Sequence, residues 1–169
     1  MDESAIRRTA NVHFSPTRKP SREARALLAT WASRRRGAVL PRLREFTLVD
    51  LQPWLAGMTL TTRLDGTPHV DFYGGSLAAS VGRCFAGAWH PEWPSWFEAI
   101  GWRTRARLHA SPEPFIEQVW LKDGEYLRVY DRLVIPVGDG GSRPEGWISF
   151  IDNRRHLRSA ARAGLIIDH

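Results

Sequence analysis

The chain's single cysteine, Cys84, lies in the string GRCFAG and is the first residue whose chemistry needs an explanation. A thiol becomes nucleophilic when a cation, a base or a helix N-terminus lowers its pKa, and the string offers Arg83 alone as such a neighbour. We therefore expect Cys84 to pack as a small apolar side chain rather than to react. A lone cysteine also excludes an internal disulfide framework and a cysteine-rich zinc site.

Six histidines and two closely spaced glutamates are the other candidates for catalysis or metal binding. No two histidines form an HExxH or HxH pair, so we expect no metal site. His109 could ligate haem from a helix, but it falls beside the break expected at Pro112, where an exposed side chain is the simpler prediction. Glu113 and Glu117 have the spacing of one strand face, where an acid–base pair is conceivable but a solvated edge is expected. The histidines are His13, His69, His90, His109, His156 and His169.

Motifs for hydrolysis and for nucleotide binding are missing from the sequence. The chain has no GxSxG elbow, phosphate loop or dinucleotide glycine fingerprint. Its glycine-rich segment, GDGGSRPEG, lies between expected strands and does not open a helix, so it offers phosphate no helix N-terminus. We therefore predict a non-enzymatic protein whose sequence requires no cofactor.

The formal charge of +6 is concentrated at the N-terminus, because residues 1–36 hold nine basic and three acidic residues. We expect residues 1–20 to be a flexible basic arm and residues 154–169 to be a basic tail that could form a last helix. The arm could contact an acidic protein, anionic lipid or nucleic acid, although a solvated surface explains the same charge. Nucleic acid is not favoured, since Phe14 and Trp31 are the only aromatic residues among these arginines.

The composition is that of a globular domain, with 43% hydrophobic and 25% charged residues. No apolar run approaches the roughly 20 residues that span a bilayer, so we expect no membrane span. The first residues also lack the apolar core of a secretion signal. We expect a cytoplasmic protein.

Residues 21–37 have the pattern of an amphipathic helix. Ser21 is a suitable N-cap and Gly37 a suitable terminator. Apolar residues recur between them at positions i, i+3, i+4 and i+7, which are Ala24, Leu27, Leu28 and Trp31.

Two regions rich in strand-forming residues follow, separated by a helical middle. In the first, MTLTTRL and PHVDFY surround the Asp-Gly pair at 65–66, and in the second, FIEQVWLK and EYLRVYDRLVIPV surround the pair at 123–124. WISFID supplies a fifth strand. Along the long strand, Arg128, Tyr130 and Arg132 share one face and apolar residues dominate the other, so we expect one wet face and one buried face.

Residues 74–112 are expected to form the helical middle. GGSLAASVGR predicts a short helix ended by Gly82, and SWFEAIGWRTRARLHA predicts a longer one that Gly101 weakens. Four tryptophans are concentrated in this segment: Trp89, Trp93, Trp96 and Trp102. They could simply cover the sheet, or they could line a cavity for a small apolar ligand.

Two strands, a helical segment and three more strands form the layout of a PAS domain. Over residues 25–153 the chain resembles a family of small, largely stand-alone bacterial PAS proteins with an N-terminal helix. The resemblance rests on Trp31 and Gly37 leading into LPRLREFTLVDLQPWL, on HVDFYGGSLAASVGRCFAG, and on YDRLVIPV before a terminal strand. It implies an α+β fold, with a five-stranded antiparallel sheet over residues 38–153 and a helical bracket on one face. GRCFAG lacks the asparagine and glutamine of the flavin-attaching motif of light-sensing relatives, so we expect no flavin there. Some PAS sensors hold haem through a helix histidine, but the position of His109 beside the break at Pro112 makes haem unexpected as well.

The resemblance implies a sensory or regulatory module that binds a small ligand, a protein partner or both. Candidates for the lining of a cavity beneath the bracket are Tyr73, Cys84, Trp96, Ile100 and Trp120. The contact of a homodimer, or the surface that passes a signal to a protein partner, would be the apolar stripe of the N-terminal helix, namely Leu27, Leu28 and Trp31. The alternative is an interaction scaffold without a pocket, whose basic arm contacts an acidic partner or nucleic acid.

Overall fold

The computed structural model describes residues 12–16, 20–123 and 126–152. The strands are β1 (Val12–Pro16), β2 (Met58–Thr62), β3 (His69–Tyr73), β4 (Phe115–Asp123), β5 (Tyr126–Gly138) and β6 (Pro144–Ile151). The helices are α2 (Arg22–Arg34), α3 (Leu48–Leu51), α4 (Gly75–Val81) and α5 (Ser95–Ala110), with 3₁₀ turns at Leu43–Glu45, Leu55–Gly57 and His90–Glu92. This is an α+β fold.

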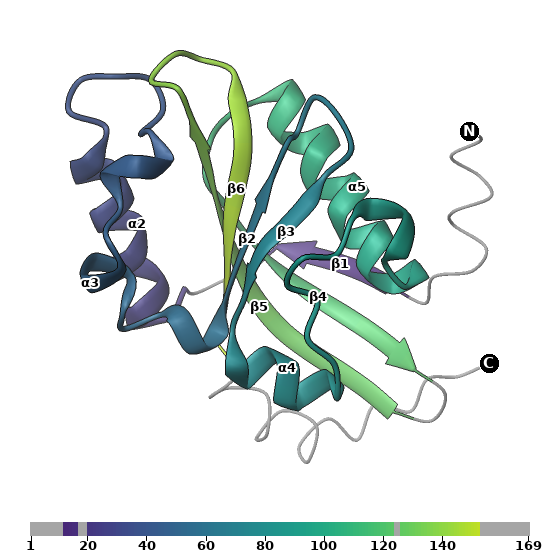
Figure 1. The fold of residues 1–169 in the computed structure, drawn as a ribbon. Coiled ribbons are helices and arrows are strands. Elements are labelled where there is room, and N and C mark those ends of the chain that lie inside the picture. The colour runs from purple at the N-terminus through teal and green to yellow at the C-terminus, as the bar shows by residue number, and fades with distance from the viewer. Residues whose placement is uncertain (1–11, 17–19, 124–125, 153–169) are drawn as a thin grey trace.

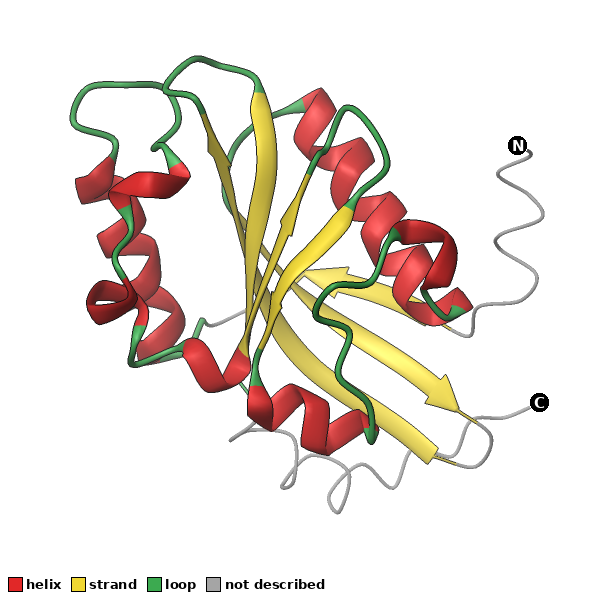
Figure 2. Ribbon diagram, viewed as in Figure 1, coloured by secondary structure: helices red, strands yellow, loops and turns green. Residues whose placement is uncertain are grey.

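All six strands belong to one antiparallel sheet, in the order β1-β4-β5-β6-β2-β3. Helices cover both faces of this twisted sheet (Figure 1). On one side lie α2 and α3, and on the other lie α4 and α5, as the red ribbons on either side of the yellow strands show (Figure 2). We call the side under α2 and α3 the outer face and the side under α4 and α5 the inner face.

The first strand, β1, lies inside the segment predicted to be a flexible arm, so the sheet has six strands and not the predicted five. It pairs antiparallel with β4, with Phe14 opposite Val119. The prediction was wrong because a five-residue edge strand has little periodicity of its own and depends on pairing with residues far away in the chain. The rest of the predicted arm, residues 1–11 and 17–19, and the predicted tail, residues 154–169, lie outside the described residues.

The predicted N-terminal helix is confirmed as α2, which Ser21 caps through a side-chain hydrogen bond of 3.1 Å to the first turn. Its apolar stripe lies against the outer face, where Leu27 and Trp31 are buried and Leu28 is partly buried. Trp31 Nε1 donates to the carbonyl of Pro136 in β5 at 2.7 Å. The stripe is therefore occupied within the chain and is not free to form the predicted dimer contact. An amphipathic pattern shows that a helix needs an apolar partner but does not show which surface provides it.

Both predicted hairpins are present, because β2 pairs with β3 and β4 pairs with β5. Residues 74–112 fold back over the inner face as α4 and α5 (Figure 1). The first of these helices ends as predicted at Gly82, whose φ of +72° lies in the left-handed region. Gly101 lets Trp93 pack closely onto α5, since a Cβ at this glycine would lie 2.5 Å from the Trp93 ring.

Candidate functional site

A cavity of about 760 Å³ lies between the inner face of the sheet and the helices α4 and α5. Its apolar wall comes from both layers and consists mainly of Leu77 on α4, Trp96, Phe97 and Ile100 on α5, and Leu121 on β4. Exposed residues of α4, among them Ala79 and Ser80, form part of its rim. Its polar wall comes mainly from the strands.

Two apolar clusters fix α5 to the sheet near its two ends. Near the C-terminal end, Leu108 packs with Phe115 and Trp147. Near the N-terminal end, Phe97 stacks on Phe85 with ring centroids 5.1 Å apart and meets Trp93 at 4.8 Å. The first half of the helix, with Trp96, Phe97 and Ile100, lines the cavity, and Arg103 and Thr104 further along belong to the polar network beside it.

The central strand β5 supplies the polar wall, with Arg128, Tyr130 and Arg132 on one face of the strand. We predicted that this face would be wet, but α4 and α5 cover it and Arg132 is only 3% exposed. The prediction that these three residues share a face was right and the predicted exposure was wrong, and Val129 between them also reaches the cavity. Alternation separates two faces of a strand, but it does not show whether the polar face meets water or a second layer.

Arg132 is held by the carboxylate of Glu117 in β4, which is 2% exposed. Arg132 Nη2 donates to Glu117 Oε1 at 2.5 Å and to Thr104 Oγ1 of α5 at 2.8 Å. Arg103 Nε donates to Glu117 Oε2 at 3.0 Å, so both carboxylate oxygens are engaged. The prediction that Glu117 lies on a solvated edge was wrong, because α5 covers this face and β1 extends the sheet beyond β4. Glu113 precedes the strand and is exposed.

Two buried polar atoms of cavity-lining residues have no hydrogen-bond partner among the described residues: Arg132 Nε and Ser149 Oγ. Ser149 lies on β6 and is 2% exposed. Leaving a buried donor or acceptor unsatisfied costs about 1–3 kcal/mol, and most such groups in proteins are paired. These two unsatisfied atoms lie on neighbouring strands of one cavity wall. They therefore mark a place where polar atoms of a ligand can bind.

Two tyrosines in the cavity wall keep their protons well into the alkaline range. Burial raises the pKa of Tyr130 to about 12, although Arg132 and Arg128 nearby favour its ionised form. Burial also raises the pKa of Tyr73 far above its ordinary value, and Tyr130 and Cys84 add to the shift. At neutral pH both phenols are uncharged hydroxyl groups that can donate hydrogen bonds.

Three of the five predicted lining residues, Tyr73, Trp96 and Ile100, line the cavity. Cys84 does not, because it is exposed in the segment after α4. Its neighbour Phe85 is buried instead and occupies the place between layers that we expected Cys84 to fill. The predictions that Cys84 packs as an apolar residue and lines the cavity were both wrong.

Trp120, the fifth predicted lining residue, lies on the other face of β4. Leu121 is the residue of this strand that reaches the cavity, and alternation turns Trp120 away from it. Trp120 Nε1 donates to Ser15 Oγ of β1 at 3.2 Å. The prediction was wrong by one residue, which in a strand changes the face.

Apart from Tyr73, the polar residues of the site were not among the predicted lining residues. Arg128, Arg132 and Ser149 line the cavity, and Glu117 fixes Arg132 from behind. A usable signal was present in the sequence: two arginines on one face of a long strand whose other face is mostly apolar. A strand of thirteen residues in the middle of a sheet is expected to be covered on both faces, which makes charged residues there unusual.

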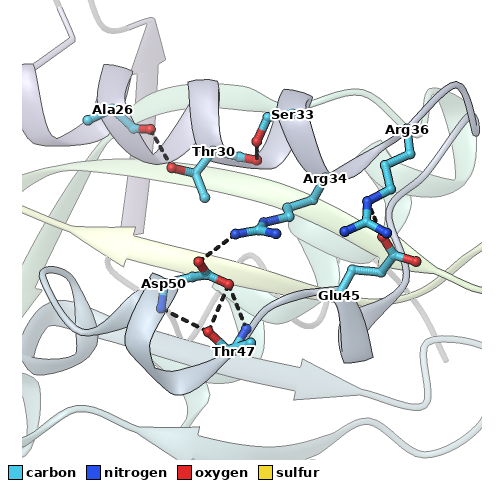
Figure 3. Close-up of polar contacts among 8 residues, drawn as sticks. All are labelled: Ala26, Thr30, Ser33, Arg34, Arg36, Glu45, Thr47 and Asp50. Carbon is cyan, nitrogen blue, oxygen red and sulfur yellow. Dashed lines mark hydrogen bonds and ion pairs between the residues drawn. The ribbon is translucent and has the colours of Figure 1, made fainter.

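A second polar cluster joins α2 to α3 on the outer side of the sheet (Figure 3). Arg34 Nη2 donates to Asp50 Oδ1 at 2.5 Å, and the Thr47 N–H donates to Asp50 Oδ2 at 3.0 Å. The hydrogen bonds from Thr47, first that of its backbone, hold the pKa of Asp50 below its ordinary value. None of these residues lines the cavity, and both oxygens of the carboxylate are engaged within the cluster. We interpret it as a structural clasp between the two helices.

Comparisons of the chain with protein-family models, curated proteins and solved structures find no match. Within the described ranges, no three or more histidine, cysteine, aspartate or glutamate side chains are grouped as a metal site. The described helices are also too short or too polar to cross a membrane.

Proposed function

We propose that the protein is a non-enzymatic sensory or regulatory module of the PAS type, whose cavity beneath α4 and α5 binds a small ligand. The observation that carries this proposal is the cavity. Its volume of about 760 Å³ falls among the volumes of small-molecule sites, roughly 300–1,000 Å³. Its wall is mostly apolar with a few polar groups in one place, which is the usual composition of such sites.

The order of elements supports the PAS assignment. Strands β2 and β3 precede the helical segment, β4 to β6 follow it, and the helices of that segment cover one face of the sheet. These five strands are contiguous in the sheet as β4-β5-β6-β2-β3. The strand β1 is an addition at the edge beside β4 and leaves this order unchanged.

The strands β5 and β6 offer a route from the cavity to the outer face. Arg132 and Ser149 line the cavity, whereas their chain neighbours Leu133 and Ile148 pack in the cluster that contains α2. A ligand shifts an equilibrium between two arrangements by the difference in its affinity for them. The helix α2, which Trp31 ties to β5, is the element whose packing would change and be recognised by a protein partner.

The binding proposal is tested with a neutral fluorescent probe, N-phenyl-1-naphthylamine, and the full chain. We expect saturable 1:1 binding, and we expect Ala79→Trp to weaken it at least about tenfold, because this exposed residue of α4 lines the cavity. The matched control is Ala106→Trp on α5, which is also exposed and does not line the cavity. Absence of saturable binding to the unaltered protein, or equal losses in both variants, would refute a ligand cavity.

The signalling part is tested separately by hydrogen exchange on the same samples. We expect the probe to change the exchange of α2 amides as well as those of α4 and α5, because α2 packs on the strands that form the cavity wall. A change confined to α4 and α5 would leave binding intact and contradict α2 as the output element.

A further inference from the structure

We propose that the ligand of this cavity is a small organic acid, whose carboxylate binds at Arg132, Ser149 and Arg128 and whose apolar body lies under α4 and α5. This inference rests on the proposed function and adds the chemical class of the ligand.

The charged residues that line the cavity have one sign. Two arginines, Arg128 and Arg132, belong to the lining, and no aspartate or glutamate is among the described residues that form it. Glu117 lies behind Arg132 and also pairs with Arg103 and Arg107, so its negative charge is matched by three guanidinium groups. A cation would meet two positive charges and no free carboxylate in this wall, whereas an anion would supply the missing negative charge.

The contact to Glu117 orients Arg132 for a second partner. Arg132 Nη2 is bound by both Glu117 and Thr104, while Nε has no partner among the described residues. A guanidinium carries five N–H donors in a fixed plane, so fixing one nitrogen leaves the remaining donors with a defined direction. Carboxylates are the acceptors that match this geometry and form the stronger, charge-assisted hydrogen bonds.

Ser149 supplies a second unpartnered group on the neighbouring strand. In the register of β5 and β6, Ser149 lies opposite Val134 and Ile151 lies opposite Arg132. Arg132 and Ser149 are therefore diagonal neighbours on one face, a relation that places Cα atoms about 7–8 Å apart. The two oxygens of one carboxylate can accept from two such donors at once.

Arg128 is the third element of the anion site and lies nearer the rim. Its Nη1 donates to the carbonyl of Ser80 at 2.6 Å, which ties the end of α4 to β5 above the cavity. Between the two arginines on this strand face lies Tyr130, which burial keeps neutral and which therefore does not repel an anion. A carboxylate would join these donors to the arginine–glutamate network without a new unpaired charge.

The apolar part of the wall argues against a small inorganic anion as the ligand. Leu77, Trp96, Phe97 and Ile100 line the side opposite the strands, and phosphate or sulfate would leave this apolar surface unused. Burial of apolar ligand surface contributes about 25 cal/mol per Å², so a hydrocarbon chain or an aromatic ring attached to the carboxylate adds affinity. The fitting class is a monocarboxylate with an apolar body, such as a medium-chain fatty acid or an aryl acid.

The test compares three probes that share one apolar body: octanoate, 1-octanol and octylamine at pH 7. Each competes with the neutral fluorescent probe on the full chain. We expect octanoate to displace it at a concentration at least about tenfold below that of octanol, and octylamine to be the weakest. Displacement by octanol or octylamine at concentrations equal to or below that of octanoate overturns the organic-acid assignment. Failure of the fluorescent probe itself to bind is a different outcome and refutes the proposed function.

Three variants locate the anion site. We expect Arg128→Met to weaken octanoate about tenfold and Ser149→Ala to weaken it about threefold, with octanol nearly unchanged in both. The matched control is Arg143→Met, whose arginine is 76% exposed and pairs with Asp65 away from the cavity. Equal losses for octanoate and octanol would show that these residues act on the packing and not on the carboxylate, and would overturn the assignment.

The double variant Arg132→Met with Glu117→Leu addresses the buried pair without leaving a single unpaired charge. Replacing both members of a buried ion pair by apolar residues is often neutral for stability, so the protein is expected to fold. We expect the double variant to lose the preference for octanoate over octanol while it still binds the fluorescent probe. A preference that persists at its original size in this variant contradicts the placement of the carboxylate at Arg132.

Discussion

The outer and inner faces of the sheet are made by the same strands, yet one carries an apolar cluster and the other carries a cavity. On the outer face, Leu133 and Ile135 of β5 and Ile148 of β6 pack against Leu27 and Trp31 of α2 in one apolar cluster. On the inner face, the alternate residues of the same two strands include Arg132 and Ser149, which line a cavity. Strand alternation alone thus produces a dry core and a polar wall from one stretch of sequence.

The covering helices differ in how they meet the two faces. On the outer side, the apolar stripe of α2 lies directly against the sheet, with Leu27 fully buried. On the inner side, α5 is fixed near its two ends by the clusters of Leu108 and Phe97, and its middle contributes Thr104 to a polar network. The apolar core under α2 and the cavity to which we assign the ligand therefore lie on opposite faces of the same strands.

The largest expected effect comes from breaking the buried pair of the inner face. Glu117→Leu alone should lower the free energy of unfolding by about 3–5 kcal/mol, because it leaves the guanidinium of Arg132 buried without its carboxylate. The double variant with Arg132→Met should recover most of this loss. Urea unfolding of both variants measures the difference. A single variant that loses less than about 1 kcal/mol would show that water reaches Arg132 freely, contrary to its burial.

A leucine-to-alanine substitution should have different effects on the outer and inner faces of the sheet. Leu27→Ala on α2 should cost about 3–5 kcal/mol because it opens a new void in a filled cluster. Leu77→Ala on α4 should cost about 2 kcal/mol, less than Leu27→Ala, because it enlarges a cavity that already exists. Both leucines are buried in helices, so the difference in unfolding free energy isolates the packing around them. Equal costs would mean that the inner face is as tightly filled as the outer one.

A pH-dependent effect is expected on the inner face. Because the pKa of Tyr130 is raised to about 12 in the folded protein, its contribution to stability is complete below pH 10 and is lost as the pH rises through 12. Relative to pH 8, this residue should remove about 1 kcal/mol from the free energy of unfolding at pH 11. The measurement is urea unfolding at both pH values for the unaltered protein and for Tyr130→Phe, which should show a smaller alkaline loss. Identical alkaline losses in the two proteins would contradict a phenol whose pKa is raised in the folded protein.

The helices and hairpins of the fold could be predicted from the sequence because their signals are local. Ser21 and the stripe that contains Leu27 define α2 within one segment, and Gly82 ends α4 through its own backbone conformation. The strand β1 and the burial of Glu117 could not be predicted in this way. Both depend on segments that are distant in sequence: β1 on its pairing with β4, and Glu117 on Arg132 and on α5.

The candidate site was predicted in part, and two of its predicted lining residues were placed wrongly, each for its own reason. Cys84 and Trp120 were predicted to line the cavity, but the buried residue is Phe85 in the first case and the lining residue is Leu121 in the second. In a strand, a shift of one residue reverses the face, and the register of β4 is set by its neighbours. The segment that holds Cys84 follows the left-handed turn at Gly82, whose exit direction no periodic pattern describes. The sequence therefore predicts which helices and strands surround the cavity. Which side chains of these elements point into it depends on the tertiary structure.

The smallest expected effect concerns the clasp on the outer side, which carries polar contacts without forming a site (Figure 3). Thr47 is the N-cap of α3, and its Oγ1 accepts from the Asp50 N–H at 3.1 Å. Thr47→Ala should lower the free energy of unfolding by about 0.5–1 kcal/mol, as is usual for loss of a cap.

The matched control for this cap is Thr30→Ala in the interior of α2, where the hydroxyl returns a hydrogen bond to the carbonyl of Ala26 at 3.1 Å. Such a bond adds little to a helix whose backbone is already paired, and alanine has the higher helix propensity, so the control should be neutral or slightly stabilising. Neither substitution should alter binding of the fluorescent probe, because both residues lie outside the lining. A loss of probe affinity in Thr47→Ala would mean that the outer side reaches the cavity through α3 as well as α2, and the division of roles between the two faces would have to be redrawn.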